Sequence, residues 1–319
     1  MGVRMYVKNI LLWKILTFAG FFVALAESFV FPAKQNVNET PYRLLLVGFI
    51  VFYAVLLVVS TARKTQYINR GPFRFACGVV LAVYDFLSTK SNIMPLPFFP
   101  GPAQIFQVLV EDRMNLLKHT AFSLRLFFVG FLVGIIIGIV TGVIIGWYAV
   151  CNYWIFPVLK VTGVIPAVAW IPIAMAIFPS SFIAGVFLIA ICSWFPVAFM
   201  VSTGISATPK TYFEAARTLG GNSAFLLFRI ALPNAVPALF TGVSTATGLS
   251  FGTLVVSEMV GAKAGLGFYI NWAKGWSAYS KVFAAIIVMA VAFSIVLWAI
   301  NLVRCRLLIW QAGIVTGRE

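Results

Sequence analysis

Residues 126–147 read LFFVGFLVGIIIGIVTGVIIGW, an apolar run without a charged side chain. A helix needs about 20 consecutive apolar residues to cross a bilayer, so this run is long enough to span one. Lipid offers backbone amides no hydrogen-bond partner, so a single span of this kind forms a helix and not an isolated strand. The run therefore predicts a membrane-spanning helix.

The whole chain has the composition that this run suggests. Of its 319 residues, 62% are hydrophobic and 10% are charged, whereas a soluble domain is about half apolar and about a quarter charged. We therefore expect an all-α polytopic membrane protein with about eight transmembrane helices. The predicted spans are residues 10–31, 43–61, 73–90, 119–148, 152–178, 181–205, 235–259 and 279–304.

The basic residues predict how these spans are oriented. The formal net charge of +15 would suggest nucleic acid in a soluble chain. Here Lys and Arg lie mostly at the ends of spans, where they orient helices and meet anionic lipid. We therefore expect a lipid partner and no nucleic acid. The dense basic segment 63–74 is expected in the cytoplasm, which places both termini and the loop 206–233 there.

The first two spans form a segment without motifs, residues 1–70, followed by a motif-bearing core at 71–310 and a cytoplasmic tail at 311–319. The first span also admits a second interpretation, because Lys8 and Lys14 precede an apolar run ending Ala24-Leu25-Ala26, which resembles a signal-peptide cleavage site. We favour a retained helix, because the apolar run continues through Phe31 and no exported domain follows.

The loop 206–233 has the pattern of a helix-turn-helix. Thr208-Pro209 suits a helix start, and Gly220-Gly221 suits its end, because glycine readily adopts the left-handed conformation. Asn222-Ser223 can cap a second short helix. Glu214 and Arg217 are three residues apart and can pair on one helix face.

The same loop resembles the cytoplasmic signature loop of ABC importer permeases. The matching residues are Glu214-Ala215-Ala216, then Gly220, then Ile230-Ala231-Leu232-Pro233. The resemblance covers roughly residues 95–310 and is closest to the permeases for nitrate, sulfonate, taurine and bicarbonate. Three stretches carry this narrower match: Pro100-Gly101-Pro102 with Ser123-Leu124-Arg125, Ile165-Pro166 with Ala169-Trp170-Ile171-Pro172, and Ser257-Glu258-Met259-Val260-Gly261 with Gly265-Leu266-Gly267.

The resemblance implies a six-helix type I permease core with two additional N-terminal helices, placed in a bacterial inner membrane. It implies that the loop docks on a separate ATPase through Glu214, Ala215, Ala216, Arg217, Gly220, Leu232 and Pro233. The implied partners are two ATPase subunits, which hold ATP and Mg, a solute-binding protein and a second permease copy. The sequence departs from the family at Gly163-Val164 and Pro179-Ser180-Ser181, and these departures bear on the substrate more than on the mechanism.

The expected function is passage of a small oxyanion or sulfonate through the membrane by alternating access. Import of a neutral heterocycle or vitamin precursor by the same machinery is an alternative, because the spans are rich in aromatic residues. A secondary transporter without an ATPase is a weaker alternative, because we see neither inverted repeats nor paired ionisable residues in the spans.

We expect no enzymatic activity, no catalytic residue, no bound cofactor and no metal site. The chain has one His, no Cys/His cluster and no Walker A pattern. Its four cysteines are widely separated and are expected to serve as small apolar packing residues.

Residues inside or near spans are the candidates for the translocation path, because polar groups and helix breaks are costly in lipid. Each has a structural alternative: a snorkelling side chain for Arg125, a kinked helix for Pro166, and a structural or outer-gate contact for Glu258. We expect His119, Asp85 and Glu27 to reach interfacial water. The candidates are Arg125, Ile165, Pro166, Trp170, Pro172, Ser250 and Glu258.

Glycine recurs at every fourth position of the first quoted span, at Gly130, Gly134, Gly138, Gly142 and Gly146. Residues four apart lie on nearly the same face of a helix, so these glycines form a ridge without side chains. We expect this ridge to pack closely against another helix, in preference to forming a gating hinge.

Overall fold

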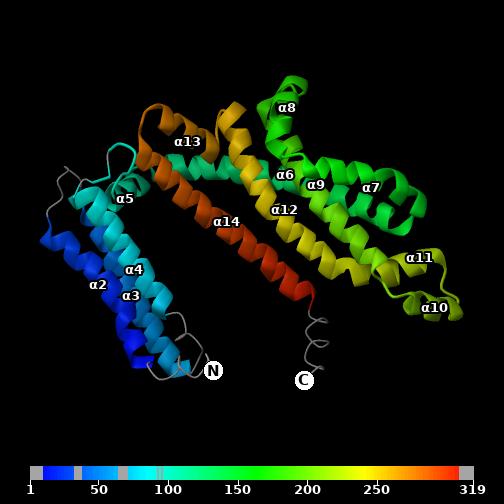
Figure 1. Ribbon diagram of the computed structural model, residues 1–319, viewed down its shortest axis with the longest axis horizontal. Helices are drawn as coiled ribbons and strands as arrows, with labels where there is room; N and C mark the ends of the chain where they lie inside the picture. Colours follow the sequence, from blue (N-terminus) through cyan, green and yellow to red (C-terminus); the bar gives the residue numbers. More distant parts are fainter. Residues whose placement is uncertain (1–9, 32–37, 64–70, 92, 95, 309–319) are drawn as a thin grey trace. The chain divides into compact units, whose positions relative to one another are not determined.

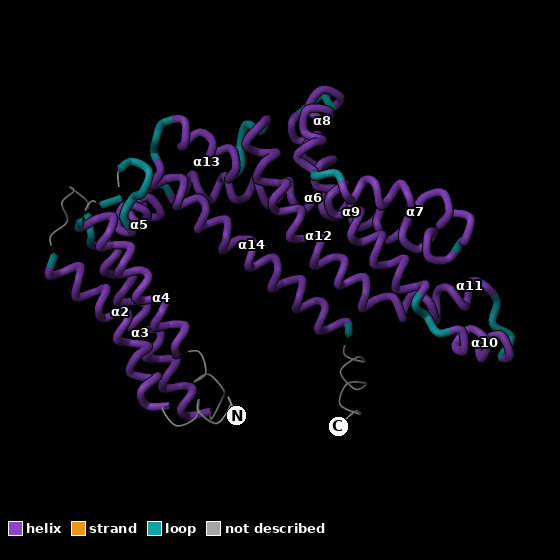
Figure 2. Tube along the Cα trace, in the orientation of Figure 1, coloured by secondary structure: helices purple, strands orange, loops and turns teal. Residues whose placement is uncertain are grey.

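The chain is helical throughout the part that the computed structural model describes, which is residues 10–31, 38–63, 71–91, 93–94 and 96–308. No strand occurs within those ranges, as Figure 2 shows. The predicted all-α class is therefore confirmed. The predicted tail at 311–319 and residues 64–70 of the basic segment lie outside the described residues.

Two compact units emerge from the contacts within the chain: unit 1 is residues 1–116 with 272–286, and unit 2 is residues 117–271 with 287–319. Each unit has hydrophobic clusters of its own. The functional boundaries predicted at residues 70 and 310 remain predictions.

The helices of the first part of the chain are α2 (Ile10–Val30), α3 (Thr40–Arg63), α4 (Gly71–Asp85), the π-helix η2 (Phe86–Lys90) and α5 (Pro102–Glu111).

The longer helices follow from residue 113 onward (Figure 1). Helix α9 packs along α12. The sequence did not lead us to expect α13 in the segment between the last two spans. The helices are α6 (Arg113–Trp147), α7 (Ala149–Val164), the 3₁₀ turn η3 (Ala167–Trp170), α8 (Ile171–Ile177), α9 (Ser181–Ser206), α10 (Lys210–Thr218), α11 (Ser223–Phe225), the π-helix η4 (Leu226–Ala231), α12 (Leu232–Gly261), α13 (Leu266–Gly275) and α14 (Tyr279–Leu307).

All eight predicted spans fall on helical segments. Four segments in the described residues are long and apolar enough to cross a membrane, namely α6, α9, Ser223–Gly261 and α14. The pair formed by α7 and Ala167–Ile177 makes a fifth if it counts as one span, and it is bent by 96°. Shorter apolar helices lie at Phe18–Val30 and Thr40–Leu56. The span predicted at 152–178 is therefore broken, which follows from Pro166 and its restriction of the preceding residue.

The glycine ridge of α6 lies directly against α9. A Cβ atom built on Gly134 would lie 2.5 Å from the carbonyl oxygen of Ala190 and 2.9 Å from its Cα. Each of the other four glycines likewise faces residues of α9, between Val186 and Ile205. The expectation of close packing is therefore confirmed, because only glycine leaves room for the backbone of α9.

Unit 1 has a different interior. Helices α2 and α4 also cross closely, at Gly20 and Gly78. Beside an apolar cluster that includes Tyr42 and Leu46, this unit buries charged side chains. Asp85 is only 2% exposed, so the expectation that it reaches interfacial water is wrong. The surrounding helices cover it, which its position near a span end did not indicate.

Candidate functional site

The loop between α9 and α12 forms the predicted helix-turn-helix. Helix α10 ends at a glycine turn in which Gly220 N–H donates to the Arg217 carbonyl (3.0 Å) and Gly221 N–H donates to the Ala216 carbonyl (2.9 Å). Gly220 has φ +84°, the left-handed conformation expected of it. The Asn222 side chain then caps α11 by accepting from Phe225 N–H (2.8 Å). These hydrogen bonds fix the turn between α10 and α11.

Two details of the loop differ from the expectation. Pro209, and not Thr208, stands at the N-cap of α10. The Thr208 hydroxyl is buried and accepts from the Asn234 side chain of α12 (3.1 Å), so it joins the loop to the next span. No ion pair joins Glu214 to Arg217 within the described residues. Both side chains are exposed and line a groove instead.

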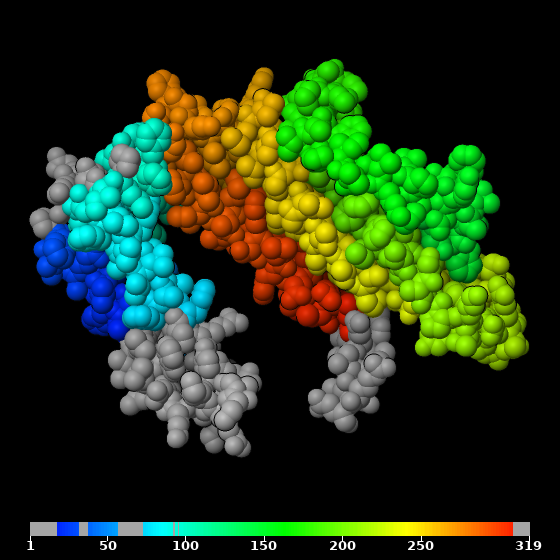
Figure 3. Space-filling model, in the orientation of Figure 1, coloured from blue at the N-terminus to red at the C-terminus, as the bar shows by residue number. Residues whose placement is uncertain are grey.

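The surface of α10 suits docking of another protein. Glu214 and Ala215 are exposed, whereas Ala216 is 8% exposed and packs inward. Figure 3 shows the segment 207–225 at one end of unit 2, open on the side in view. Beside it lies a groove of about 490 Å³. The groove is lined by the end of α6, the end of α9, and Lys210, Phe213, Glu214 and Arg217 of α10.

The loop is mechanically joined to several long helices. The ring of Phe213 packs edge-on against Trp147 at the end of α6, with ring centroids 6.0 Å apart. Leu232 and Pro233 begin α12 without interruption after the π-helix η4. A displacement of α10 would therefore be transmitted to α6 through Trp147, to α9 through the chain, and to α12 through η4 and Thr208.

The candidate path residues lie on different elements: the break between α7 and α8, helix α6 and helix α12. Ile165, Pro166, Trp170 and Pro172 lie at the break between α7 and α8, where Trp170 stacks into a cluster with residues of α8 and α9. The indole N–H of Trp170 has no hydrogen-bond partner within the described residues. The Ser250 hydroxyl on α12 is fully buried and also lacks one there. Both groups are buried hydrogen-bond donors, and whether they line the path stays a prediction.

Arg125 and Glu258 have surroundings of their own. The guanidinium of Arg125 is exposed and lies over the ring of Phe182, 5.2 Å from its centroid. Glu258 is 1% exposed. Its Oε2 atom accepts from Ser123 Oγ–H (2.9 Å) and from Gly267 N–H (2.8 Å). This is the structural contact that we expected as one alternative for Glu258.

Ser123 and His119 extend that contact, and the sequence did not reveal their part in it. Ser123 Oγ accepts from Leu266 N–H (2.8 Å), and His119 Nδ1 accepts from Gly265 N–H (3.1 Å). Gly265 and Gly267 are required here, because the Glu258 side chain occupies the space that a Cβ would need at Gly265, and the Val255 carbonyl and Glu258 occupy it at Gly267. The segment before α13 is thereby fastened to α6 and to the end of α12. The motif Ser257-Glu258 with Gly265-Leu266-Gly267 was the available signal.

Comparison with known proteins identifies the family. The family described as "Binding-protein-dependent transport system inner membrane component" matches residues 134–308, more than half of the chain. The chain belongs to this family. It is 32% identical over 248 residues to the nitrate import permease protein NrtB of Leptolyngbya laminosa, which covers 76% of this chain and 85% of that protein.

Two further proteins extend this result. The taurine transport system permease protein TauC of Escherichia coli K12 is 26% identical over 243 residues, 74% of this chain and 88% of that protein. A crystal structure of the MetNI methionine ABC transporter, in an inward-facing conformation, superposes with a TM-score of 0.53 at 21% identity. It covers 62% of this chain and 98% of that one, and it shows the shared fold. The chain is therefore a multi-pass inner-membrane permease of the ABC importer type.

Proposed function

We propose that this permease couples ATP hydrolysis in a separate subunit to solute import through helix α10. The observation that carries the proposal is the surface of α10, on which Glu214 and Ala215 are exposed beside a groove. In a membrane protein, an exposed rigid helix joined to three long apolar helices is suited to receive a push from a partner. Ala216 packs the inner side of α10. The proposal gives a supporting role in the loop to Arg217 and Gly220 at the end of α10 and to Leu232 and Pro233 at the start of α12.

The remaining parts of the machinery follow from this proposal. Two ATPase subunits hold ATP and Mg and dock on α10 in the cytoplasm, where both termini of the permease also lie. A second copy of the permease completes the translocation path as a homodimer, and a solute-binding protein delivers the solute from the other side. The permease itself binds no cofactor. ATP binding closes the ATPase pair, and the displacement of α10 switches the spans between inward-open and outward-open states.

We propose a small oxyanion or sulfonate as the solute. The names of two relatives, a nitrate and a taurine permease, support this class. The exposed guanidinium of Arg125 suits an anionic solute, and so do the unpartnered donors of Trp170 and Ser250, which are buried here and would have to become exposed when the spans switch. Glu258 is buried, and Ser123 and Gly267 hold its Oε2 atom, so we expect it to make no direct contact with the solute.

Co-purification tests the docking role of α10. The tagged permease is purified in mild detergent from its native host, and bound proteins are identified by mass spectrometry. We expect an ATPase with the wild type and its loss with Glu214→Arg, which places like charges beside Arg217. The matched control Lys263→Glu reverses one exposed charge in the loop before α13 and should retain the ATPase. An ATPase that is absent from the wild type even after crosslinking would contradict the proposal and favour secondary transport.

Uptake measurements test the solute class. The complex is reconstituted in vesicles with its binding protein, and ATP-dependent uptake of labelled nitrate, taurine and bicarbonate is measured. We expect one of these anions to be taken up, and Arg125→Gln to reduce its rate. If none of the three anions is taken up and a neutral heterocycle is, the proposal of an anionic solute is wrong, while the coupling proposal still stands.

A further inference from the structure

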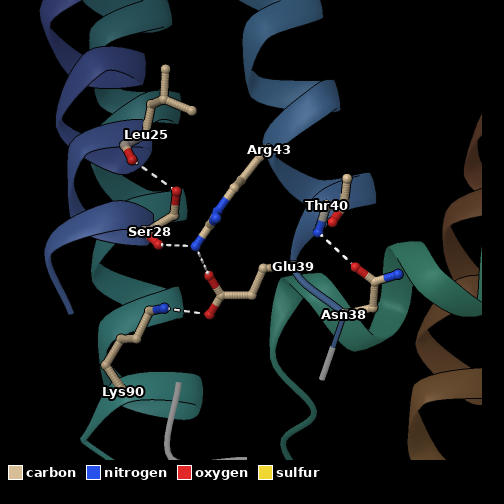
Figure 4. A network of polar contacts seen from close by, with 7 residues as sticks. All are labelled: Leu25, Ser28, Asn38, Glu39, Thr40, Arg43 and Lys90. Atoms are coloured by element: carbon tan, nitrogen blue, oxygen red, sulfur yellow. Dashed lines mark hydrogen bonds and ion pairs between the residues drawn. The ribbon is translucent and has the colours of Figure 1, made fainter. Parts of the chain in front are cut away.

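The buried charges of unit 1 form a cluster that the transport mechanism does not use. Glu39, just before α3, accepts from Lys90 Nζ at 2.5 Å through Oε1 and from Arg43 at 2.7 Å through Oε2. Arg43 also donates to the main-chain oxygen of Ser28 at 2.5 Å. Figure 4 shows Arg43 from α3 and Lys90 from η2 converging on the Glu39 carboxylate. Lys90 is only 5% exposed and the Glu39 side chain 10%, so this ion pair lies inside the unit, whereas the Arg43 side chain is 35% exposed.

Two further carboxylates belong to the same cluster. Asp85, at the end of α4, lies within electrostatic range of Glu39 and Lys90. Glu27 on α2 lies within range of Asp85 and Lys90. Among the described residues, the cluster therefore places three carboxylates against two cationic side chains. An unbalanced buried charge is costly, so either a proton or a bound cation has to supply one more positive charge when the other groups are ionised.

Buried oxygen atoms that lack a hydrogen-bond partner indicate where a bound cation would lie. Within the described part of the chain, Glu27 Oε1, Tyr42 OH and Asp85 Oδ1 have no hydrogen-bond partner. Tyr42 is 1% exposed and Asp85 is 2% exposed. Tyr42 is within electrostatic range of both carboxylates, and the Thr89 hydroxyl lies beside Asp85. These three atoms are hard oxygen ligands, of the kind that alkali and alkaline-earth cations prefer.

The backbone is irregular at the same place. Helix α4 changes to a π-helix at Phe86–Lys90, directly after Asp85, and Ser88, Thr89 and Lys90 of this segment are buried. Short π segments occur preferentially at functional sites, since they change which groups the helix presents. The carboxyl end of a helix also carries partial negative charge, which favours a cation.

We propose that Glu27, Tyr42 and Asp85 form a binding site for one monovalent cation of the size of sodium. A single missing positive charge favours a monovalent ion over a divalent one. The described residues contain no group of three or more His, Cys, Asp or Glu placed to hold a metal ion, and the proposed site has only two carboxylates and one phenol. The bound ion links α2, α3 and α4. The proposal does not depend on the transport function.

Binding of radiolabelled Na⁺ to the purified full-length chain tests the site, at fixed pH and at an ionic strength kept constant with choline chloride. We expect saturable binding of about one ion per chain, weakened about tenfold or more by Asp85→Asn. Tyr42→Phe removes one neutral ligand and should weaken binding less. Glu111→Gln, an exposed carboxylate at the end of α5, is the matched control and should leave binding unchanged.

A proton on Glu27 or Asp85 would supply the same charge, and the experiment separates the two. In that case the wild type binds no Na⁺ at neutral or alkaline pH, and the proposal is wrong. Equal affinity in the wild type, Tyr42→Phe and Asp85→Asn would also overturn it, because the ion would then be bound elsewhere. If Asp85→Asn does not yield a monodisperse protein, the comparison of Tyr42→Phe with Glu111→Gln decides the question.

Discussion

In unit 1, α2, α3 and η2 meet around buried charges, whereas in unit 2, α6 and α9 meet along bare backbone. The pair Glu39–Lys90 joins residues 51 positions apart in the chain, and the contact of Gly134 with Ala190 joins two long apolar helices. Both units use glycine where helices cross, but within the described residues only unit 1 adds a network of ion pairs. The difference implies that unit 1 is sensitive to loss of a charge, and unit 2 to gain of a methyl group.

The largest effect is expected for Lys90→Met, which removes one partner of a buried ion pair. Breaking such a pair costs about 3–5 kcal/mol, because the remaining charge stays buried. Denaturation of the purified chain in detergent measures the loss. The control is Lys281→Met. The Lys281 side chain is 34% exposed, and its Nζ atom lies 3.4 Å from Asp112 Oδ2. That change should cost about 0–1 kcal/mol. If both variants lost the same free energy of unfolding, the buried ion pair would contribute no more to stability than the partly exposed one.

Gly134→Ala is expected to have the next largest effect, by pushing α6 and α9 apart. The added methyl group meets the backbone of Ala190, which cannot give way as a side chain does, and such overpacking costs about 1–3 kcal/mol. Gly248→Ala in α12 is the matched control, because nothing lies within 4 Å of its added Cβ. Thermal unfolding of both variants gives the comparison. A loss of stability with Gly248→Ala that matches Gly134→Ala would show that helix propensity, and not packing, decides.

The two kinds of interior differ in how far the sequence reveals them. The glycine ridge repeats every fourth residue on one helix, so its packing role could be predicted, and the end of α10 could be predicted from Gly220-Gly221. The ion pair of Glu39 with Lys90 could not, since it joins residues 51 positions apart and leaves no local pattern. The same holds for the contact of Glu258 with Ser123, which lies 135 residues away in the chain. Helix α13 was missed because it is short and lies between two spans.

Glu258→Gln tests whether a buried polar contact in unit 2 matters as much as those of unit 1. The amide still accepts a hydrogen bond, but bonds to a charged acceptor are stronger, so we expect a loss of about 1 kcal/mol. Glu111→Gln is the control and should change stability by less than about 0.5 kcal/mol. Denaturation of both variants, with Ser123→Ala and the double variant, isolates the coupling of Glu258 to Ser123. Additive losses would mean that the two side chains do not act together.

The smallest effect is expected for Thr141→Val, which removes the hydroxyl that accepts from the indole N–H of Trp194 between α6 and α9 (2.9 Å). Hydrogen bonds between helices in membranes contribute about 0.6 kcal/mol on average, because the separated helices find other partners. Thr162→Val on α7 is the matched control, since the Thr162 hydroxyl donates to the carbonyls of its own helix. If Thr141→Val destabilises as strongly as Gly134→Ala, then hydrogen bonding holds α6 to α9 as much as close packing does, and the contrast between the two units disappears.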